Sequence, residues 1–240
     1  MRRLGAKPSS ALVRRVQSLV LSDAIGSRMY NAACSQVRFV IKPTHLTSMS
    51  ALEAIGGTRI FSSEDGVRAL AAPPPCRLTV ETLGNATMAE VSASRVHRSL
   101  LKKAIATYVG NWAVMVRRKG ASSGPKYVTV CGFFQDGSDG AEAIGGHERL
   151  VKHVHLCTYA RLRHPDHVYL FTGTFVAGVS SGGRCDVLVN ARSGTWALAK
   201  RILAASGAGI STGDDLDAEV TRFAEPMVTK VVKRALGVKR

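Results

Sequence analysis

Two predicted β-hairpins are the feature that most constrains how this chain can fold. Residues 112–118 and 126–134 are rich in β-branched and aromatic side chains, and they flank the turn-forming sequence KGASSGP. Residues 167–177 and 184–190 repeat this arrangement around a second turn rich in Gly and Ser. Strands joined by short turns pair antiparallel. We therefore expect an α+β fold in which antiparallel β-sheet carries packed helices.

The second turn contains a serine-hydrolase pattern, G-x-S-x-G, formed by Gly178, Ser180 and Gly182. In hydrolases this pattern marks a sharp turn between a strand and a helix, which exposes the nucleophilic serine. Here the residues that follow, GRCDVLVN, predict a second strand instead of a helix. We interpret the pattern as a hairpin turn and assign no nucleophile to it.

Three of the helical regions predicted beyond the N-terminus follow from the helical spacing of apolar residues. The first covers residues 95–109 and ends at Gly110, and the second covers residues 196–206. The third, in the C-terminal tail, is expected as two short helices divided at Pro226. Proline lacks the amide hydrogen that a helix interior needs, so it favours a break there.

A repeated pentapeptide suggests how these elements are organised. The sequence EAIGG occurs at residues 53–57 and again at 142–146, and each copy precedes predicted strands and a helix. The chain is therefore expected to form one α+β domain or two repeated strand-strand-strand-helix modules. The expected divisions are a leader over residues 1–30, a first module over 31–110, a second module over 111–209 and a helical tail over 210–240. The first module would contain strands at residues 58–62, 77–83 and 87–91.

This order of strands and helices is similar to that of the Whirly-type proteins, which bind single-stranded nucleic acid. The resemblance covers the order of elements and no motif residues. It implies an antiparallel sheet and a nucleic-acid partner.

The first 30 residues have the composition of a mitochondrial presequence. They are rich in Arg, Ser and Ala, with Asp23 as their one acid. On a helix, Val13, Val16 and Val20 fall on one side, and Arg14 lies on another. The tripeptide that ends at Tyr30 resembles a processing site, so we expect cleavage there and a location in the mitochondrial matrix. The alternative is a basic helix or RNA-binding arm that stays attached.

The net charge of the chain points to a polyanionic partner. The charge is +16 at pH 7, with an isoelectric point near 10.2. The five cysteines are scattered and form no C-x-x-C pair, which suits a reducing compartment and argues against a zinc finger. Apolar runs stay below the roughly 18 residues of a spanning helix, so we expect no stable transmembrane anchoring.

Residues 150–164, LVKHVHLCTYARLRH, are the candidate binding surface. As a strand, this segment places apolar residues on one side and polar residues on the other, although a helix also fits its pattern. Arginine pairs with phosphate and tyrosine stacks on bases, a combination that single-stranded RNA surfaces use. The predicted RNA-binding residues are Arg161, Arg163, Tyr159, His153, His155, Arg117, Arg118, Lys119, Lys126, Arg95, Arg98, Lys102 and Lys103.

A metal site in this segment is the less favoured interpretation. His153, His155 and Cys157 alternate along the segment, which places potential ligands about 7 Å apart on a strand. A tetrahedral site could use them only with ligands from other elements. We therefore expect neither a metal nor a cofactor.

Together these patterns predict a basic mitochondrial RNA-binding protein without catalytic activity, because no complete set of acid, base and nucleophile can be assembled. It would act as a mitochondrial ribosomal subunit or as an accessory factor in RNA processing. Its partners would be ribosomal or single-stranded mitochondrial RNA and the protein subunits of a larger ribonucleoprotein assembly. The alternative is a protein-docking assembly or translocase subunit at the inner membrane, whose small domains residues 170–198 resemble in their strand, glycine turn, strand and Gly-x-Trp ending.

Overall fold

The computed structural model of the chain describes residues 10–22, 24–29, 59–63, 104–121, 124–136, 156, 163–191, 193–210 and 213–238. Within these residues, a five-stranded antiparallel sheet and four helices confirm the expected α+β class. One of these helices is a short segment over residues 24–29. The other elements are α1 (Ala11–Val20), β1 (Arg59–Ser62), β2 (Ala104–Arg117), β3 (Tyr127–Asp136), β4 (His167–Ser180), β5 (Cys185–Asn190), α7 (Gly194–Ala205) and α8 (Asp214–Ala235).

The sheet has the strand order β1-β3-β2-β4-β5, and every neighbouring pair is antiparallel. Both predicted hairpins are confirmed, as β2–β3 and β4–β5. Strands β2 and β4 pair along most of their lengths at the centre of the sheet. Residues 111–116 and 167–178 are buried without alternation. Continuous burial of this kind means that both faces of the central strands are covered.

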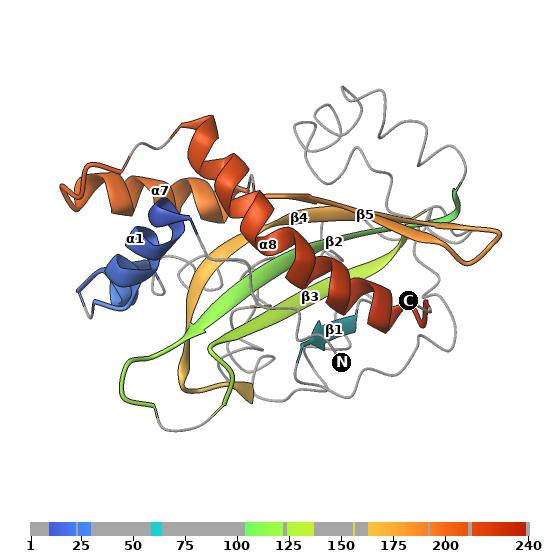
Figure 1. Cartoon of the computed structure of the whole chain (residues 1–240), viewed down its shortest axis with the longest axis horizontal. Coiled ribbons are helices and arrows are strands. Elements are labelled where there is room, and N and C mark those ends of the chain that lie inside the picture. Colours follow the sequence, from blue (N-terminus) through green and yellow to red (C-terminus); the bar gives the residue numbers. More distant parts are fainter. Residues whose placement is uncertain are drawn as a thin grey trace, which may run out of the picture.

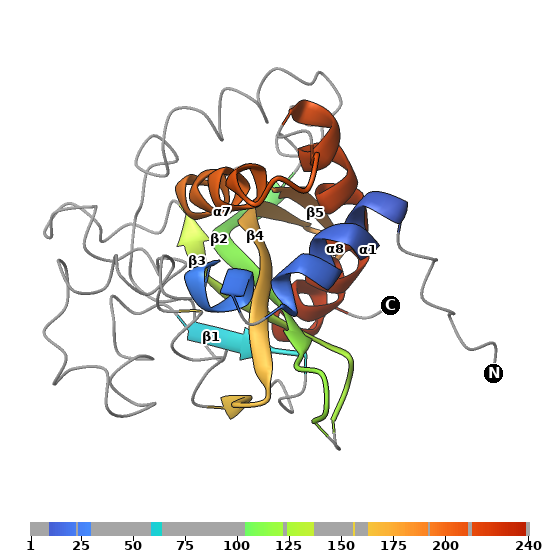
Figure 2. The same cartoon turned by 90° about the vertical axis from the view of Figure 1, so that its left-hand side faces the viewer.

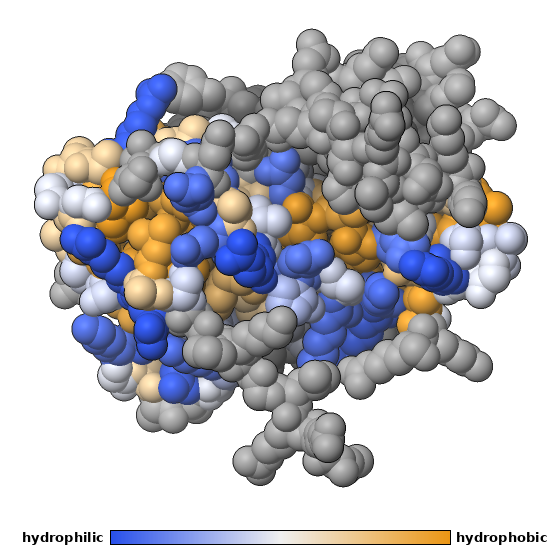
Figure 3. Space-filling view, turned by 45° about the horizontal axis from the view of Figure 1, so that its top comes forward, coloured by the Kyte–Doolittle hydropathy of each residue, from blue (hydrophilic) through white to orange (hydrophobic). Residues whose placement is uncertain are grey.

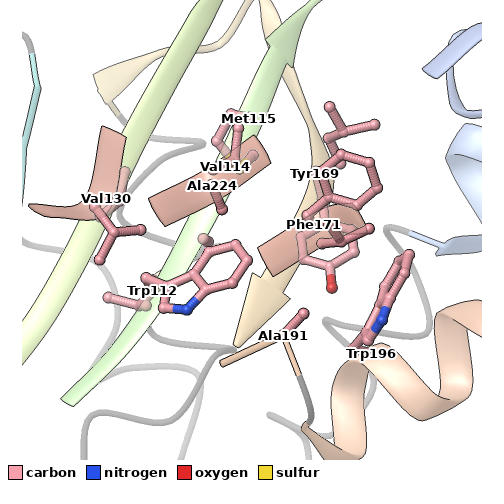
Figure 4. Close-up of a cluster of buried hydrophobic side chains, with 14 of the residues drawn as sticks. Trp112, Val114, Met115, Val130, Tyr169, Phe171, Ala191, Trp196 and Ala224 are labelled. Carbon is pink, nitrogen blue, oxygen red and sulfur yellow. The ribbon is translucent and has the colours of Figure 1, made fainter. Parts of the chain in front are cut away.

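Helix α8 lies across one face of the sheet, which we call the helix-covered face (Figure 1). Phe171 on β4 packs at this face against Trp196 of α7 and Phe223 of α8, with ring centroids 5.4 and 5.7 Å apart. Figure 4 shows Phe171 and Trp196 beside Trp112 and Tyr169 in the same apolar cluster. The buried residues of α8 recur at helical spacing: Leu216, Val220, Ala224, Val228, Val231, Val232 and Ala235.

The predicted helix over residues 95–109 is wrong where the structure describes it. Residues 104–109 belong to β2 and pair with β3 on one side and β4 on the other. A central strand position outweighs local helical preference, especially for the β-branched residues here. Gly110, expected to end the helix, lies in the strand instead. A Cβ atom there would collide with the Gly132 carbonyl and with Phe133, so glycine allows the close approach of β3.

The predicted break at Pro226 is also wrong, because α8 continues through this residue from 214 to 235. A proline in a helix interior leaves the carbonyl four residues earlier without its usual amide donor, which here is the carbonyl of Arg222. Pro226 and Arg222 are both exposed. Water can therefore hydrate that carbonyl, and the buried residues on either side keep the helix on the sheet.

The expected division into repeated modules is not confirmed. Strand β2 runs through the boundary that was placed between residues 110 and 111, and strands from both expected modules join one sheet. The predicted strand at 58–62 is present as β1. The predicted strands at 77–83 and 87–91, the first part of the 95–109 helix and both EAIGG copies lie outside the described residues.

The amphipathic helix expected near the N-terminus is present as α1, and it packs on the body of the protein. Its apolar residues Val13, Val16 and Val20 are buried in the main hydrophobic core. Figure 2 shows α1 beside α8 and β4, and contacts join it to both elements. Ser10 caps the helix by accepting a hydrogen bond from the Val13 amide, 3.1 Å away.

Candidate nucleic-acid interface

The end of β2 and the loop that follows it carry a group of cations that we call the basic tip, formed by Arg117, Arg118, Lys119 and Lys126. Arg118, Lys119 and Lys126 are exposed. The Arg117 guanidinium donates to the Gly124 carbonyl within the loop. That contact holds the Arg117 side chain against the loop backbone. The other three cations face solvent.

The start of β4 lies beside the basic tip, as Figure 1 shows at the lower left of the molecule. The Arg118 amide donates to the Asp166 carbonyl over 2.7 Å, and Arg117 is the register partner of His167. This pairing of β2 with β4 brings Arg163, only three residues before Asp166, to the same end of the sheet. The sequence predicted one patch only if residues 150–164 formed a strand beside the hairpin. The structure instead brings Arg163 to this end through β4, and most of residues 150–162 lie outside the described part of the chain.

His167 ties the two segments together. One of its ring nitrogens, Nε2, lies 2.9 Å from the Pro125 carbonyl of the β2–β3 loop. The other, Nδ1, is buried without a hydrogen-bond partner in the described structure. The His164 ring packs edge-on against that of His167, with centroids 5.8 Å apart. His167 was not among the predicted RNA-binding residues, and its position at the first residue of β4 was the signal that could have identified it.

Positive charge dominates this end of the sheet. The basic tip and residues 163–167 together contain five Arg or Lys side chains, two histidines and one acidic side chain, Asp166. Among the described residues, no carboxylate lies within ion-pairing distance of Arg118, Lys119 or Lys126. The Lys126 ammonium lies 5.3 Å from the centroid of the Tyr127 ring, a cation–π distance. Clustered, exposed cations of this kind attract polyanions.

The structure places only part of the predicted site. Arg163 is exposed and helical, and Leu156 is buried and helical, so the strand interpretation of residues 150–164 is wrong at these two positions. The helical alternative fits them, because an amphipathic helix also buries one side of such a segment. The predicted residues outside the described part of the chain are His153, His155, Tyr159, Arg161, Arg95, Arg98, Lys102 and Lys103.

The described groups that could act as nucleophiles are placed in structural roles. Ser180 lies at the β4–β5 turn, where its hydroxyl accepts from the Arg184 amide at 3.2 Å, as expected for a hairpin turn. Burial raises the pKa of the Cys131 thiol far above its usual value. Burial likewise raises the pKa of Cys185, which nearby Lys233 partly opposes. A reactive thiol needs a lowered pKa and access to solvent, and these two have neither.

The described residues offer no group of three His, Cys, Asp or Glu side chains that could bind a metal ion. The histidines and the cysteine considered for a metal, His153, His155 and Cys157, lie outside these residues. Of the helices that the structure describes, none combines the length and the apolar character needed to cross a bilayer.

The chain has no significant match among protein-family models, curated protein sequences or solved structures.

Proposed function

We propose that this protein binds RNA, with the basic tip as a phosphate-contacting surface. The observation that carries the proposal is the exposed cluster of Arg118, Lys119 and Lys126. The pairing of β2 with β4 brings residues 163–167 to the same end of the sheet, and Asp166 is the one acid among these described residues. Phosphate neutralisation by lysine and arginine supplies most of the affinity in such surfaces. Residues 150–164 would extend the surface with Arg161 and Tyr159.

The shape of the tip supports a single-stranded partner. A two-stranded loop that projects from a sheet presents cations at short intervals, and flexible single strands can follow such a surface. The buried pairing of β2 with β4 holds the base of the loop in place. The proposed RNA is therefore ribosomal RNA in an unpaired region or another single-stranded mitochondrial transcript.

A double substitution at the tip tests the proposal directly. The full chain carrying Arg118→Gln and Lys119→Gln would be titrated with a labelled oligouridylate of about 20 nucleotides, across salt concentrations from about 50 to 200 mM. Loss of two phosphate contacts should weaken binding about tenfold or more at low salt, and it should reduce the slope of log affinity against log salt by about 1.4. The matched control is Lys230→Gln with Arg234→Gln, which removes the same charge from exposed positions on α8. Equal losses in the two variants would reduce the effect to net charge and contradict a site at the tip.

The proposal places the protein in the mitochondrial matrix, as part of a ribosomal or RNA-processing assembly and without a reaction of its own. Support comes from α1, whose sequence pairs an apolar side with exposed Arg14 and Arg15 and contains no acid. Residues 1–34 fused to a fluorescent reporter should direct that reporter to mitochondria, and a diffuse reporter would contradict the location. Sedimentation of the native assembly should change after ribonuclease treatment. An unchanged assembly would favour docking on protein.

A further inference from the structure

The surface beneath α1 has features of a helix-binding site. Val13, Val16 and Val20 of α1 are at most 1% exposed, so one side of the helix is enclosed by the body of the protein. We call this surface the α1 seat. It is formed on α8 and β4, and three polar partners of the helix border it: Tyr127 of β3, the Ala208 carbonyl after α7 and Glu219 of α8.

The three polar contacts fix the direction and register of the bound helix. The Ser10 hydroxyl at the helix N-cap donates to the Glu219 carboxylate, and a carboxylate at this end also suits the helix dipole. The Arg15 guanidinium donates to the Ala208 carbonyl. The Tyr127 hydroxyl donates to the Gln17 side-chain oxygen at 2.7 Å. An occupant therefore needs a hydroxyl cap, an arginine five residues later and apolar residues three, six and ten positions after the cap.

Helix α1 can separate from the seat more easily than a strand can leave the sheet. A helix satisfies its backbone hydrogen bonds internally, and the hydrogen bonds that join α1 to Tyr127, Ala208 and Glu219 all involve side chains of α1. Its removal would leave the β-ladder intact and expose an apolar surface. The α1 seat lies at the helical end of the molecule, where Figure 3 shows hydrophobic residues among strongly hydrophilic ones.

We propose that the α1 seat is a docking site for a cationic amphipathic helix, which α1 occupies within its own chain. A helix of the same pattern from another protein binds there when α1 has been cut away or displaced. The outer side of α1, with exposed Arg14 and Ser18, makes no demand on the seat and can vary between occupants. This inference is independent of RNA binding, because the seat and the basic tip use different side chains.

The test begins with the intact folded chain, into which a recognition sequence for a site-specific protease has been inserted after residue 34. After cleavage, a labelled peptide spanning residues 8–29 is titrated and its fluorescence polarisation recorded. The cut protein should bind this peptide saturably. The uncut chain should bind it at least about tenfold more weakly, because its own α1 competes at high effective concentration.

Two altered peptides make the result specific. Val16→Asp places a charge at a fully buried position and should weaken peptide binding more than about tenfold, since an unpaired charge is costly to bury. Arg14→Gln changes an exposed position and should bind like the original peptide. Equal binding of the Val16→Asp peptide would overturn the proposal. So would a cut protein that keeps its circular dichroism spectrum but binds no peptide, or one that unfolds on cleavage, because α1 would then be an inseparable part of the core. If the uncut chain forms a dimer, and Val16→Asp in the full chain abolishes that dimer, the seat would bind a second copy of the chain. That result would also overturn the proposal.

Discussion

The helix-covered face of the sheet and the basic tip both contain charged residues, but they hold them in opposite ways. Between α7 and α8, the Asp217 carboxylate accepts from the Trp196 indole at 2.6 Å and from the Lys200 ammonium at 2.9 Å. These two charges are largely enclosed, with side chains 8% and 18% exposed. At the basic tip, Lys119 and its neighbours face solvent.

This difference separates charges that maintain the fold from charges that are open to a ligand. A buried charge persists only when its partners replace the water it has lost, so its removal must affect folding. An exposed charge contributes little to folding, so its clustering calls for another explanation. Four substitutions sharpen the comparison between the buried interior and the basic tip. Three lie in the interior and one at the tip, and they are ordered from the largest expected change in the free energy of unfolding to the smallest.

The largest change is expected for Asp217→Ala. The substitution leaves Lys200 partly buried without its carboxylate and removes the acceptor of the Trp196 indole. We expect the free energy of unfolding to fall by about 3 kcal/mol, measured by urea denaturation. The control is Asp186→Ala, which breaks a pair with Arg184 whose side chains are 31% and 74% exposed, and it should cost less than about 1 kcal/mol. Similar losses in both variants would remove the distinction between enclosed and exposed charges.

A second prediction concerns the packing of the helix-covered face at Gly173. A Cβ atom at this position would overlap the Asn190 carbonyl and come within 2.6 Å of the Trp112 ring. That ring is itself fixed, because its indole nitrogen donates to the Thr174 and Asn190 carbonyls at 3.1 and 3.2 Å. Gly173→Ala should therefore lower the free energy of unfolding by about 1–3 kcal/mol.

The matched control for this prediction is Gly194→Ala at the start of α7. A Cβ atom there meets no other atom within 4 Å, and alanine favours a helix. This variant should keep or slightly raise the thermal midpoint of unfolding. Loss of stability at Gly194 equal to that at Gly173 would mean that close packing is not the cause.

A third prediction uses the buried thiol of Cys131. Burial holds its pKa far above the value of about 8.5 that it regains on unfolding. Above pH 8.5 the unfolded state therefore binds fewer protons than the folded state, and stability falls as the pH rises. Between about pH 8 and 9.5 this thiol should cost roughly 1 kcal/mol.

Replacing Cys131 with alanine isolates that effect. The variant will be less stable overall, but its stability should decline less steeply across the same pH range, because one proton release has been removed. Tyr108, whose pKa is raised by burial and by nearby Cys185, adds an effect of the same sign at still higher pH and remains in both proteins. Identical slopes in the two proteins would mean that Cys131 does not become protected from ionisation on folding.

Local patterns predicted the parts of the fold that local chemistry determines. The turns around Lys119 and Ser180 follow from glycines, serines and a proline at the turn positions, so both hairpins and the cations of the basic tip were visible in the sequence. The secondary structure at Gly110 and Pro226 depends instead on neighbours that are distant in the chain. Pairing with β3 and β4 made residues 104–109 part of strand β2 despite their helical pattern. Packing on the sheet kept α8 continuous through Pro226.

The grouping of the residues in the candidate site could not be predicted from local sequence patterns either. Arg118 and Asp166 are 48 positions apart in the chain, and their hydrogen bond depends on the long antiparallel pairing of β2 with β4. Neither strand reveals its non-hairpin partner by its pattern, because the central residues of both are buried without alternation. The sequence therefore indicated which side chains could bind phosphate, but their grouping required the register of the sheet.

The smallest change is expected at the basic tip itself, and it completes the contrast. Arg118→Gln with Lys119→Gln removes two exposed charges, so we expect the free energy of unfolding to stay within about 0.5 kcal/mol of the original protein. Mutual repulsion among the clustered cations predicts that any shift is a gain, and that this gain disappears as salt screens the charges. Urea denaturation at low and high salt measures both effects. A loss of about 2 kcal/mol or more would place these side chains among the structural charges, with Lys200, and would leave the tip without surplus charge for a ligand.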